Sequence, residues 1–529
     1  MPCSKRGRNS AKVFMTAVCC WQVRRLYRLR WEVRAYLGQS VANCRPMHAL
    51  IIALASTVIV NAQVADGTGA PLRKESVRIT DDRIAAIGTF EPARGDEVID
   101  AKGLVLAPGF IDIHNHSEEG LDRDPLATTQ IAQGITTLLL GADGGSPWPI
   151  GTWLATRRNK PVSLNFAVAV GHATVREQIL QEDFRRVARP TEIVAMAKLV
   201  EQGMNEGAIG LSSGLEYDVA SYSTTEEMVA VAEAAAKHGG FYMTHIRDEA
   251  DRSFEALREE IAIGQRARIP VQHSHIKLGT VSVWGKAADY VKIIEDARRG
   301  GLDFLADCYP YDAWYSTIKV LVPDKQYESP PSVKEALAAV GGAGNVTIAN
   351  FAANKRYEQH TIEQLAQDER IDPIEMFIRI IREGNAANDD ALIIAKSMTE
   401  ADIELFYKQP WVMVASDGGI DSQHPRGAGT FPRVLGRFVR EKHWFTLPEA
   451  IRKMTSLPAA RMGLRDRGMV RKGMFADLVL FDPETVIDRA TFAQPMELPA
   501  GIKTVFVNGV KVWSEDRPTG EKPGRVLTH

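Results

Sequence analysis

Two histidines one residue apart follow an apolar run in the stretch LAPGFIDIHNHSEEG, residues 106–120. Successive side chains on a β-strand point to opposite faces, so His114 and His116 point to the same side of the strand that this run predicts. Two imidazoles directed at one point are typical of a metal site, although such pairs also occur as ordinary surface or supporting residues. The rest of the chain has to distinguish these two interpretations.

Further imidazoles and carboxylates stand at the ends of other short apolar runs. The full set that we predict as metal ligands is His114, His116, Asp143, His245, His275 and Asp417. Four imidazoles and two carboxylates suit Zn²⁺ or another divalent ion, and they suffice for two ions if one carboxylate bridges them. Taken singly, each residue has a simpler explanation, such as a hydrogen bond at a strand end or, for Asp417, a turn. Spacing alone leaves His273 and His275 as alternatives, because both point to the same face.

The segments that carry these residues alternate between strand-like and helical patterns. Eight apolar runs qualify as strands: GFIDIHNH, ITTLLLGAD, SLNFAVAVGH, GAIGLSSGLEY, GFYMTHIRDE, IPVQHSHIK, LDFLADCYPYD and WVMVASDGG. Helical stretches such as TTEEMVAVAEAAAKHG lie between most of them, which is typical of a parallel α/β fold. Eight strands predict a (β/α)8 TIM-like barrel over residues 107–454, with an insertion at about 316–390. In such a barrel the predicted ligands meet at the carboxyl ends of the strands. An open doubly wound sheet is the alternative, but no GxGxxG follows the first strand.

Both ends of the chain differ in sequence pattern from the middle, because they consist of short strand-like segments separated by tight turns. KESVRITDDRIAAIG predicts a hairpin at its Asp-Asp turn, and GIKTVFVNGVKVWSED predicts another at Asn-Gly. We therefore predict one small β-sandwich domain built from both termini, residues 47–106 plus 455–529.

Residues 1–46 stand apart in composition. They contain ten Lys or Arg, a single acid, Glu32, and four of the five cysteines. This basic leader resembles a transit peptide in composition, but it shows neither a clean apolar core nor a small-residue cleavage pattern. We favour a disordered extension upstream of a true start at Met47.

The composition of the whole chain limits its partners. A net charge of −2 over 529 residues gives no sign of a nucleic-acid partner. The apolar run at 49–60 is too short to span a bilayer, so we expect no membrane partner. Because Cys308 is the only cysteine after the leader, no disulfide framework is expected there, which favours a cytoplasmic location. Export or an organelle is the alternative if the leader or residues 47–62 act as a targeting segment, and the sequence does not indicate an oligomeric state.

A resemblance to a known family covers the chain from about residue 55 to its end. The motifs occur in the order of the amidohydrolase superfamily: PGFIDIHNH, GHATVR, GLSSGLEY, THIRDEAD, SHIK, CYPYDA, ASDGG, HPRGAGTFPRVLGRFVRE, MTSLPAARMGL and GMFADLVLFDP. More narrowly, the chain resembles the N-acyl-D-amino-acid deacylase (D-aminoacylase) branch. That resemblance implies hydrolysis of a small N-acyl-D-amino acid to a carboxylate and a free D-amino acid.

The resemblance also implies roles for individual residues. His245 and His275 would hold a tightly bound Zn²⁺, while His114, His116 and Asp417 would line a second position that is often weakly filled. D-aminoacylases usually have a cysteine where this chain has Asp143, in GADGG. A carboxylate there makes a binuclear site more plausible and favours tolerance of other divalent metals such as Mn²⁺ or Co²⁺.

The resemblance assigns catalysis and substrate binding as well. Asp417 would take a proton from water and return it to the departing amine, because an amide nitrogen leaves poorly without protonation. Tyr309 and Arg426 match positions that recognise the substrate carboxylate, with Tyr311 as a competitor for Tyr309. Lys277 joins them from its spacing, since it shares a face with His275 if the strand extends that far.

Three other functions remain open from the sequence. A cyclic-amide hydrolase such as a hydantoinase or dihydroorotase shares the scaffold, but its bridging lysine is missing from the fourth strand, GAIGLSSGLEY. A D-dipeptide or N-acyl-D-glutamate hydrolase is a closer alternative. A non-catalytic homologue is the third, although such proteins lose metal ligands that this chain keeps.

Overall fold

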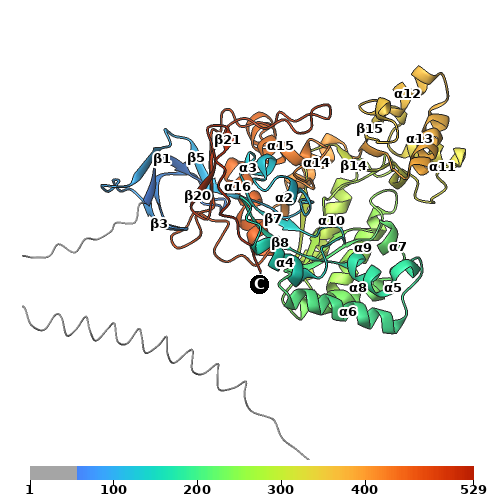
Figure 1. Cartoon of the computed structure of the whole chain (residues 1–529), viewed down its shortest axis with the longest axis horizontal. Helices are drawn as coiled ribbons and strands as arrows, with labels where there is room; N and C mark the ends of the chain where they lie inside the picture. The colour runs from blue at the N-terminus through green and yellow to red at the C-terminus, as the bar shows by residue number, and fades with distance from the viewer. Residues whose placement is uncertain (1–55, 529) are drawn as a thin grey trace, which may run out of the picture. The chain divides into compact units, whose positions relative to one another are not determined.

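The structure, a computed structural model, describes residues 56–528 (Figure 1). The predictions for the basic leader and for residues 47–55 lie outside the described residues. Within residues 56–528 no helix is both long and apolar enough to cross a membrane.

Nine buried strands form two parallel sheets. The first sheet has the order β6 (Phe110–Asp112), β7 (Ile135–Leu140) and β8 (Asn165–Val168). The second has the order β17 (Val412–Val414), β13 (Phe304–Cys308), β12 (Val271–His273), β11 (Phe241–His245), β10 (Gly210–Gly214) and β9 (Val170–Gly171). All eight predicted strands are present, because β8 and β9 are two halves of one predicted run. Their continuous apolar sequences follow from burial on both faces, as in other parallel sheets. The α/β class with parallel sheets is confirmed.

The segments that follow β6 and β17 are hydrogen-bonded to each other. The backbone N–H of His116 donates to Gly418 at 2.8 Å, and that of Asp417 donates to His114 at 3.0 Å. Asn115 and Gly418 also form an isolated parallel bridge. The first and last strands of the set therefore meet just beyond their carboxyl ends.

A buried carboxylate strengthens this junction. Asp112, at the end of β6, accepts hydrogen bonds from the backbone N–H of Ser416 at 2.9 Å and from Asn115 Nδ2 at 2.9 Å. The hydroxyl of Ser416 donates to the same carboxylate at 2.5 Å. Asp112 is completely buried, so these donors replace the water that it would otherwise bind.

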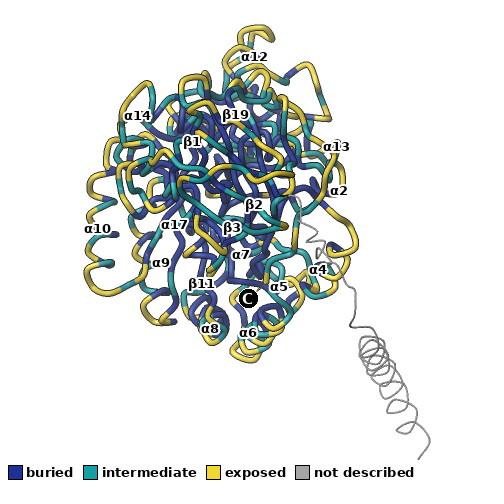
Figure 2. The backbone as a smooth tube through the Cα atoms, turned by 90° about the vertical axis from the view of Figure 1, so that its left-hand side faces the viewer, coloured by how far each residue is buried: buried dark blue, intermediate teal, exposed yellow. Residues whose placement is uncertain are grey.

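Helices connect most of the parallel strands. They are α2 (Gly120–Arg123), α3 (Thr128–Ile131), α4 (Ile150–Arg158), α5 (His172–Leu180), α6 (Pro190–Asn205), α7 (Asp218–Ser221), α8 (Thr225–Ala236), α9 (Ser253–Ala267), α10 (Ala287–Arg299) and α14 (Glu400–Tyr407). Between β17 and the terminal sheet lie α15 (Arg426–Arg433), α16 (Leu447–Met454) and α17 (Ser456–Arg461). The predicted helix TTEEMVAVAEAAAKHG is α8, which begins where Thr224 accepts a hydrogen bond from the Glu227 N–H at 3.2 Å. Figure 2 shows α6, α8 and α10 with exposed outer turns and buried inner sides.

Both ends of the described chain contribute to one nine-stranded sheet. Its strands are β1 (Ser56–Val64), β2 (Arg73–Thr80), β3 (Arg83–Gly88), β4 (Glu97–Asp100), β5 (Val105–Pro108), β18 (Leu478–Phe481), β19 (Ile502–Val507), β20 (Val510–Ser514) and β21 (Arg517–Pro518). The two ends join where β5 pairs antiparallel with β18. Both predicted hairpins are present, at Asp81-Asp82 and at Asn508-Gly509. Gly509 has a φ of 82°, and a Cβ there would lie 2.1 Å from the Asp81 oxygen, so only glycine fits this turn.

The segment between β13 and β17 forms a three-stranded antiparallel sheet with its own helices. The sheet has the order β14 (Ala313–Thr317), β16 (Leu392–Lys396), β15 (Val346–Asn350). Around it lie the short helix η2 (Ile318–Leu321) and the helices α11 (Pro330–Ala339), α12 (Ile362–Glu369) and α13 (Pro373–Ala387) (Figure 1). This segment has an apolar core of its own, which includes Val333, Ile348 and Phe377. It occupies the region of the predicted insertion.

Replacing Asp112 by alanine tests the junction between the first and last strands. Asp112→Ala removes the acceptor of the Ser416 N–H and of the Ser416 hydroxyl, so we expect the free energy of unfolding to fall by about 1–3 kcal/mol. Chemical denaturation of the metal-free protein measures this change. Asp100→Ala is the control, because Asp100 is exposed on β4 and accepts from Asn61 at 3.0 Å. Equal effects of the two substitutions would contradict the role given to Asp112.

Candidate metal centre

The predicted ligands lie at the carboxyl ends of the parallel strands, but several stand beyond the strands themselves. β6 ends at Asp112 and β12 ends at His273, so His114, His116 and His275 belong to the segments that follow. These residues and Lys277 lie outside the strands, so the prediction that strand alternation directs their side chains is wrong. Local backbone conformation directs the side chains instead. Asp143, His275 and Asp417 have φ values of 52°, 33° and 48°. Left-handed backbone in non-glycine residues is strained and is often kept at functional sites.

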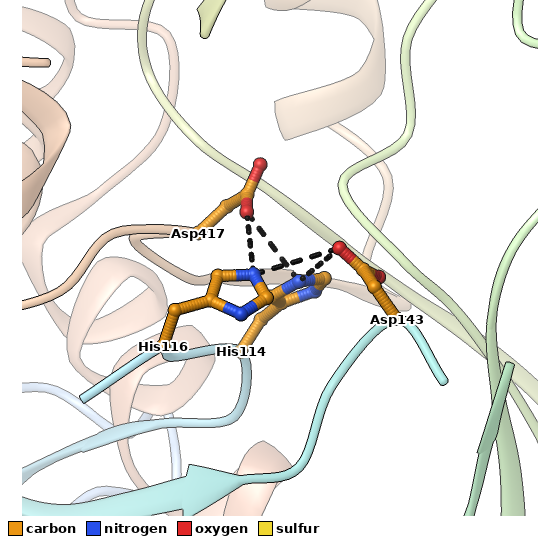
Figure 3. Close-up of side chains that lie close together, drawn as sticks. All are labelled: His114, His116, Asp143 and Asp417. Carbon is orange, nitrogen blue, oxygen red and sulfur yellow. Dashed lines mark hydrogen bonds and ion pairs between the residues drawn. The ribbon is translucent and has the colours of Figure 1, made fainter. Parts of the chain in front are cut away.

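Four of the predicted ligands form one group (Figure 3). His114 Nε2 lies 3.4 Å from Asp143 Oδ2 and 3.4 Å from Asp417 Oδ1. His116 Nε2 lies 3.5 Å and 3.2 Å from the same two oxygens. The four ligand atoms lie within 4.8 Å of one another, which is close enough to surround one cation.

A second group shares Asp143. His245 Nδ1 lies 3.1 Å from His275 Nε2, and His275 Nε2 lies 3.5 Å from Asp143 Oδ2. The ligand atoms of His245, His275 and Asp143 also lie within 4.8 Å of one another. Oδ2 of Asp143 thus faces both groups, in the position that a bridging carboxylate would occupy.

The chemistry of the two groups fits divalent cations. Both ring nitrogens of His114 and Oδ1 of Asp143 are buried without a hydrogen-bond partner, although buried polar atoms are normally paired. Imidazole and carboxylate are the ligands that Zn²⁺ and related ions take from proteins. The structure thus places imidazole nitrogens and a carboxylate oxygen without hydrogen-bond partners where the candidate ligands converge, and these atoms can bind a metal ion.

The charges of the two groups also favour a bound cation. Burial alone would raise the pKa of Asp417, but attraction from Arg426, His275 and His114 outweighs it and holds that pKa below its usual value. Burial would also raise the pKa of Asp143, and attraction from His114 and His275 instead holds it well below the usual value. Burial would lower the pKa of His114, yet Asp143 and Asp417 raise it well above 6.5. Both carboxylates are charged, and they attract positive charge to the point between the imidazoles.

The geometry separates His275 from His273. His273 is buried away from the two groups, where its Nδ1 lies 2.5 Å from the Glu260 carboxylate. Its ring packs against Tyr290 and Phe304. Of the two alternatives, only His275 lies with the other predicted ligands.

The three residues predicted to bind substrate lie together beside these groups. Arg426, the first residue of α15, pairs with Asp417 at 2.7 Å. Lys277 Nζ lies 2.7 Å from Nδ1 of His275. The Tyr309 ring lies between the two cations, 4.9 Å from the Arg426 guanidinium and 5.7 Å from Lys277 Nζ. The Tyr309 hydroxyl is buried without a partner, whereas Tyr311 bonds to Pro425 at 3.3 Å.

Two carboxylates that the sequence analysis missed contact the imidazoles. Glu216 lies 2.7 Å from His245 Nε2, and a hydrogen bond there leaves Nδ1 of His245 directed at the second group. Glu249 lies 3.0 Å from Nδ1 of His275 and holds Lys277 Nζ with both oxygens at 2.7 Å.

A third missed residue lies beneath the centre. Asp307, on β13, accepts the backbone N–H of His275 at 2.8 Å, and its Oδ1 lies 3.5 Å from His114 Nδ1. It is completely buried and connects ligands from two different strands. The sequence could have indicated all three acids as candidate site residues, because each stands at or just past the carboxyl end of a predicted strand.

A cavity of about 900 Å³ opens over the centre. His116, Asp143, His245, His275 and Asp417 line one side of it. Ligand sites in proteins commonly measure ~300–1,000 Å³, so the cavity is large enough for a small organic substrate.

Comparison with known proteins identifies the family. The chain belongs to the amidohydrolase family, whose sequence model matches residues 97–307 and 323–513. It is 35% identical over 498 residues to the D-aminoacylase of Alcaligenes xylosoxydans xylosoxydans, covering 89% of this chain and 97% of that protein. Identity to the N-acyl-D-aspartate deacylase of the same organism is 34% over 504 residues, covering 90% and 95%.

A solved structure agrees with these relatives. The crystal structure of N-acyl-D-glutamate deacylase from Bordetella bronchiseptica, complexed with zinc and a phosphonate inhibitor, matches with a TM-score of 0.80. The two chains are 31% identical, over 89% of this chain and 99% of that chain. The resemblance to the deacylase branch, first indicated by the motifs, is confirmed.

The sharing of Asp143 can be tested by metal analysis. Asp143 faces both groups, so we expect Asp143→Ala to lower the bound metal at both positions. His116→Ala is the matched control, because His116 belongs to one group only and should lower the metal at one position. Elemental analysis of protein equilibrated with Zn²⁺ measures the bound metal in each variant. An Asp143→Ala protein that keeps the wild-type content would show that Asp143 does not hold the ions.

Proposed function

We propose that this protein is a metal-dependent deacylase that hydrolyses the amide bond of N-acyl-D-amino acids. The products would be a carboxylate and a free D-amino acid. The observation that carries this proposal is the ion pair between Arg426 and Asp417, since it places a carboxylate-binding cation beside a candidate proton carrier and two candidate metal positions. Relatives whose names describe this reaction, matched over most of the chain, support it.

We also propose the finer architecture. The two parallel sheets would be arcs of one (β/α)8 barrel, which the hydrogen bonds between residues 114–116 and 417–418 support. Residues 107–454 would form this catalytic domain, and the terminal sheet would fold as a small sandwich. A cytoplasmic location stays a prediction.

The metal roles follow the two groups of side chains. His245, His275 and Asp143 would hold one Zn²⁺, and His114, His116, Asp417 and the shared Asp143 would hold a second divalent ion. When bound, such ions activate water and polarise the amide carbonyl as Lewis acids.

Asp417 would move the proton in the reaction. Its carboxylate is charged, so it can accept a proton from the attacking water while the water oxygen bonds to the amide carbon. The carbon–nitrogen bond then breaks, and Asp417 returns the proton to the leaving nitrogen. Water thus adds across the amide, and Asp417 ends in its starting state.

The substrate carboxylate would bind opposite the reacting amide. The Arg426 guanidinium offers two parallel N–H donors to a carboxylate, and the Lys277 ammonium adds a second positive charge. The Tyr309 ring lies near both cations, and its unpaired hydroxyl would be a further hydrogen-bond donor.

Replacing Asp417 by asparagine separates proton transfer from binding. Asp417→Asn keeps the shape and one oxygen ligand but cannot accept a proton, so we expect kcat to fall by about 10²–10⁴-fold while bound metal is kept. Steady-state kinetics together with elemental analysis measure the two effects. Asp421→Asn is the control, because Asp421 also lines the cavity but pairs with Arg123. Near wild-type kcat in Asp417→Asn would remove Asp417 from the mechanism.

A substrate panel tests the reaction itself. We expect the protein to hydrolyse N-acetyl-D-amino acids and to leave their L-enantiomers and a hydantoin or dihydroorotate intact. A chelator should abolish the activity, and added Zn²⁺ should restore it, because the metal supplies the Lewis acid. Release of free amine, measured in each case, is the readout. Hydrolysis of the cyclic amides alone would favour the cyclic-amide alternative.

A further inference from the structure

His424 is a buried histidine that the proposed mechanism does not use. It stands between β17 and α15, two residues before Arg426, and its side chain is completely buried. Buried polar atoms are normally paired, and both ring nitrogens of His424 have a backbone partner.

The two ring nitrogens of His424 have opposite roles. The backbone N–H of Arg426 donates to Nδ1 at 3.0 Å, and Nε2 lies 3.1 Å from the carbonyl oxygen of Ala313. A backbone N–H can only donate and a carbonyl can only accept, so Nδ1 carries no hydrogen and Nε2 carries one. Burial and the charge of Arg426 hold the pKa of His424 well below 6.5, which favours the same neutral ring.

These two hydrogen bonds reach two different parts of the cavity lining. Arg426, the candidate carboxylate-binding residue, is the first residue of α15. The first backbone N–H groups of a helix have no acceptor within that helix, so His424 supplies the acceptor that the N–H of Arg426 lacks. Ala313 is the first residue of β14, and residues 314–317 of that strand line the cavity. One imidazole thus joins Arg426 to the segment between β13 and β17.

Aromatic side chains hold the His424 ring in this orientation. The ring of Tyr311 lies 5.2 Å from it at 90°, and the ring of Phe492 lies 5.1 Å from it at 82°. Edge-to-face contacts of this kind favour one ring orientation. The directions of both hydrogen bonds are therefore fixed by packing as well as by their partners.

We propose that His424 is a positioning residue for substrate recognition, in which Nδ1 fixes the backbone of Arg426 and Nε2–H ties that backbone to β14. This inference rests on the deacylase function proposed above. His424 acts through Arg426 and touches neither the reacting amide nor the metal ligands. Its contribution is orientation, because a guanidinium pairs with a carboxylate through two parallel N–H donors only when it is correctly aligned.

Two substitutions separate the two hydrogen bonds. The side-chain oxygen of an asparagine accepts readily from the backbone N–H two residues on, so His424→Asn keeps the bond to Arg426 but is too short to reach Ala313. The longer side chain of His424→Gln carries an amide N–H where Nε2 stands, so it keeps the bond to Ala313 but has no acceptor in place of Nδ1.

The kinetic test compares an acid with its neutral analogue. The acid is the N-acetyl-D-amino acid that the Zn²⁺-loaded wild-type protein hydrolyses fastest, and in the analogue a carboxamide replaces its carboxylate. We expect His424→Gln to lower the acid-to-carboxamide ratio of kcat/KM by about tenfold, through a higher KM for the acid, because Arg426 loses its support. His424→Asn should keep the wild-type ratio. His360→Gln is the control, because His360 is exposed in the same segment as β14.

Amide hydrogen exchange provides the complementary measurement. Loss of the bond to Ala313 should speed exchange in β14 and its partner β16 in His424→Asn, while His424→Gln should keep the wild-type exchange there. The two variants are thus expected to show opposite defects, which a loss of overall stability would not produce.

The outcomes separate this inference from the function on which it rests. If the wild-type protein hydrolyses neither compound, the deacylase function and this inference both fail. If it hydrolyses acid and carboxamide equally well, Arg426 does not recognise a carboxylate and the inference fails with that role. A folded, metal-loaded His424→Gln protein with the wild-type ratio would overturn the positioning role alone. An equal loss of the ratio in His424→Asn and His424→Gln would also overturn it, since the packing of the ring would then explain the effect.

Metal content and the denaturation midpoint show whether each variant is folded. If His424→Gln does not fold, nitrogen NMR of the wild-type protein labelled at histidine supplies a second test. We expect the His424 ring to be neutral at pH 7 with its hydrogen on Nε2. A ring that is protonated, or that carries its hydrogen on Nδ1, cannot accept from the Arg426 N–H and would overturn the proposal.

Discussion

One carboxylate oxygen, Oδ2 of Asp143, lies 3.4–3.5 Å from imidazole nitrogens of His114, His116 and His275. This shared contact joins the two groups of candidate ligands into one cluster. A buried cluster of this kind is stable only if its charges balance, because buried charge is costly unless it is paired. Protonated imidazoles, Arg426 and bound cations can supply the positive charge that balances the carboxylates. A divalent cation would therefore both balance this charge and serve the proposed hydrolysis.

Precise placement of the cluster depends on hydrogen bonds beneath it. The buried carboxylates of Asp112 and Asp307 hold backbone N–H groups of Ser416 and His275, next to or at the candidate ligands. Each joins segments that come from different strands. Buried hydrogen bonds of this kind favour one arrangement of the backbone that carries the ligands, which a metal site needs because ligand distances vary little.

The sequence predicted the parallel strands and the members of the cluster, because both follow from local patterns. Apolar runs of strand length indicated the sheets, and a His or Asp near the end of such a run indicated a candidate ligand. Two features needed the fold. His275 and Lys277 lie beyond β12, so strand alternation does not set their direction, and His275 has left-handed backbone. Glu216, Glu249 and Asp307 were missed because only tertiary contacts with His245, His275 and His114 distinguish them from other strand-end acids.

Residues from two parts of the chain line the cavity, and each part has its own apolar core. The cluster belongs to the parallel sheets, which pack within the largest core, whereas Trp314, Val320 and Leu392, which also line the cavity, belong to the segment between β13 and β17. Because packing in one core is largely independent of packing in the other, substitutions in this segment can leave the positions of Asp143, His245 and His275 unchanged. The relatives named for D-aspartate and D-glutamate substrates are about as similar to this chain as the D-aminoacylase is. Overall similarity therefore does not select among these three substrates.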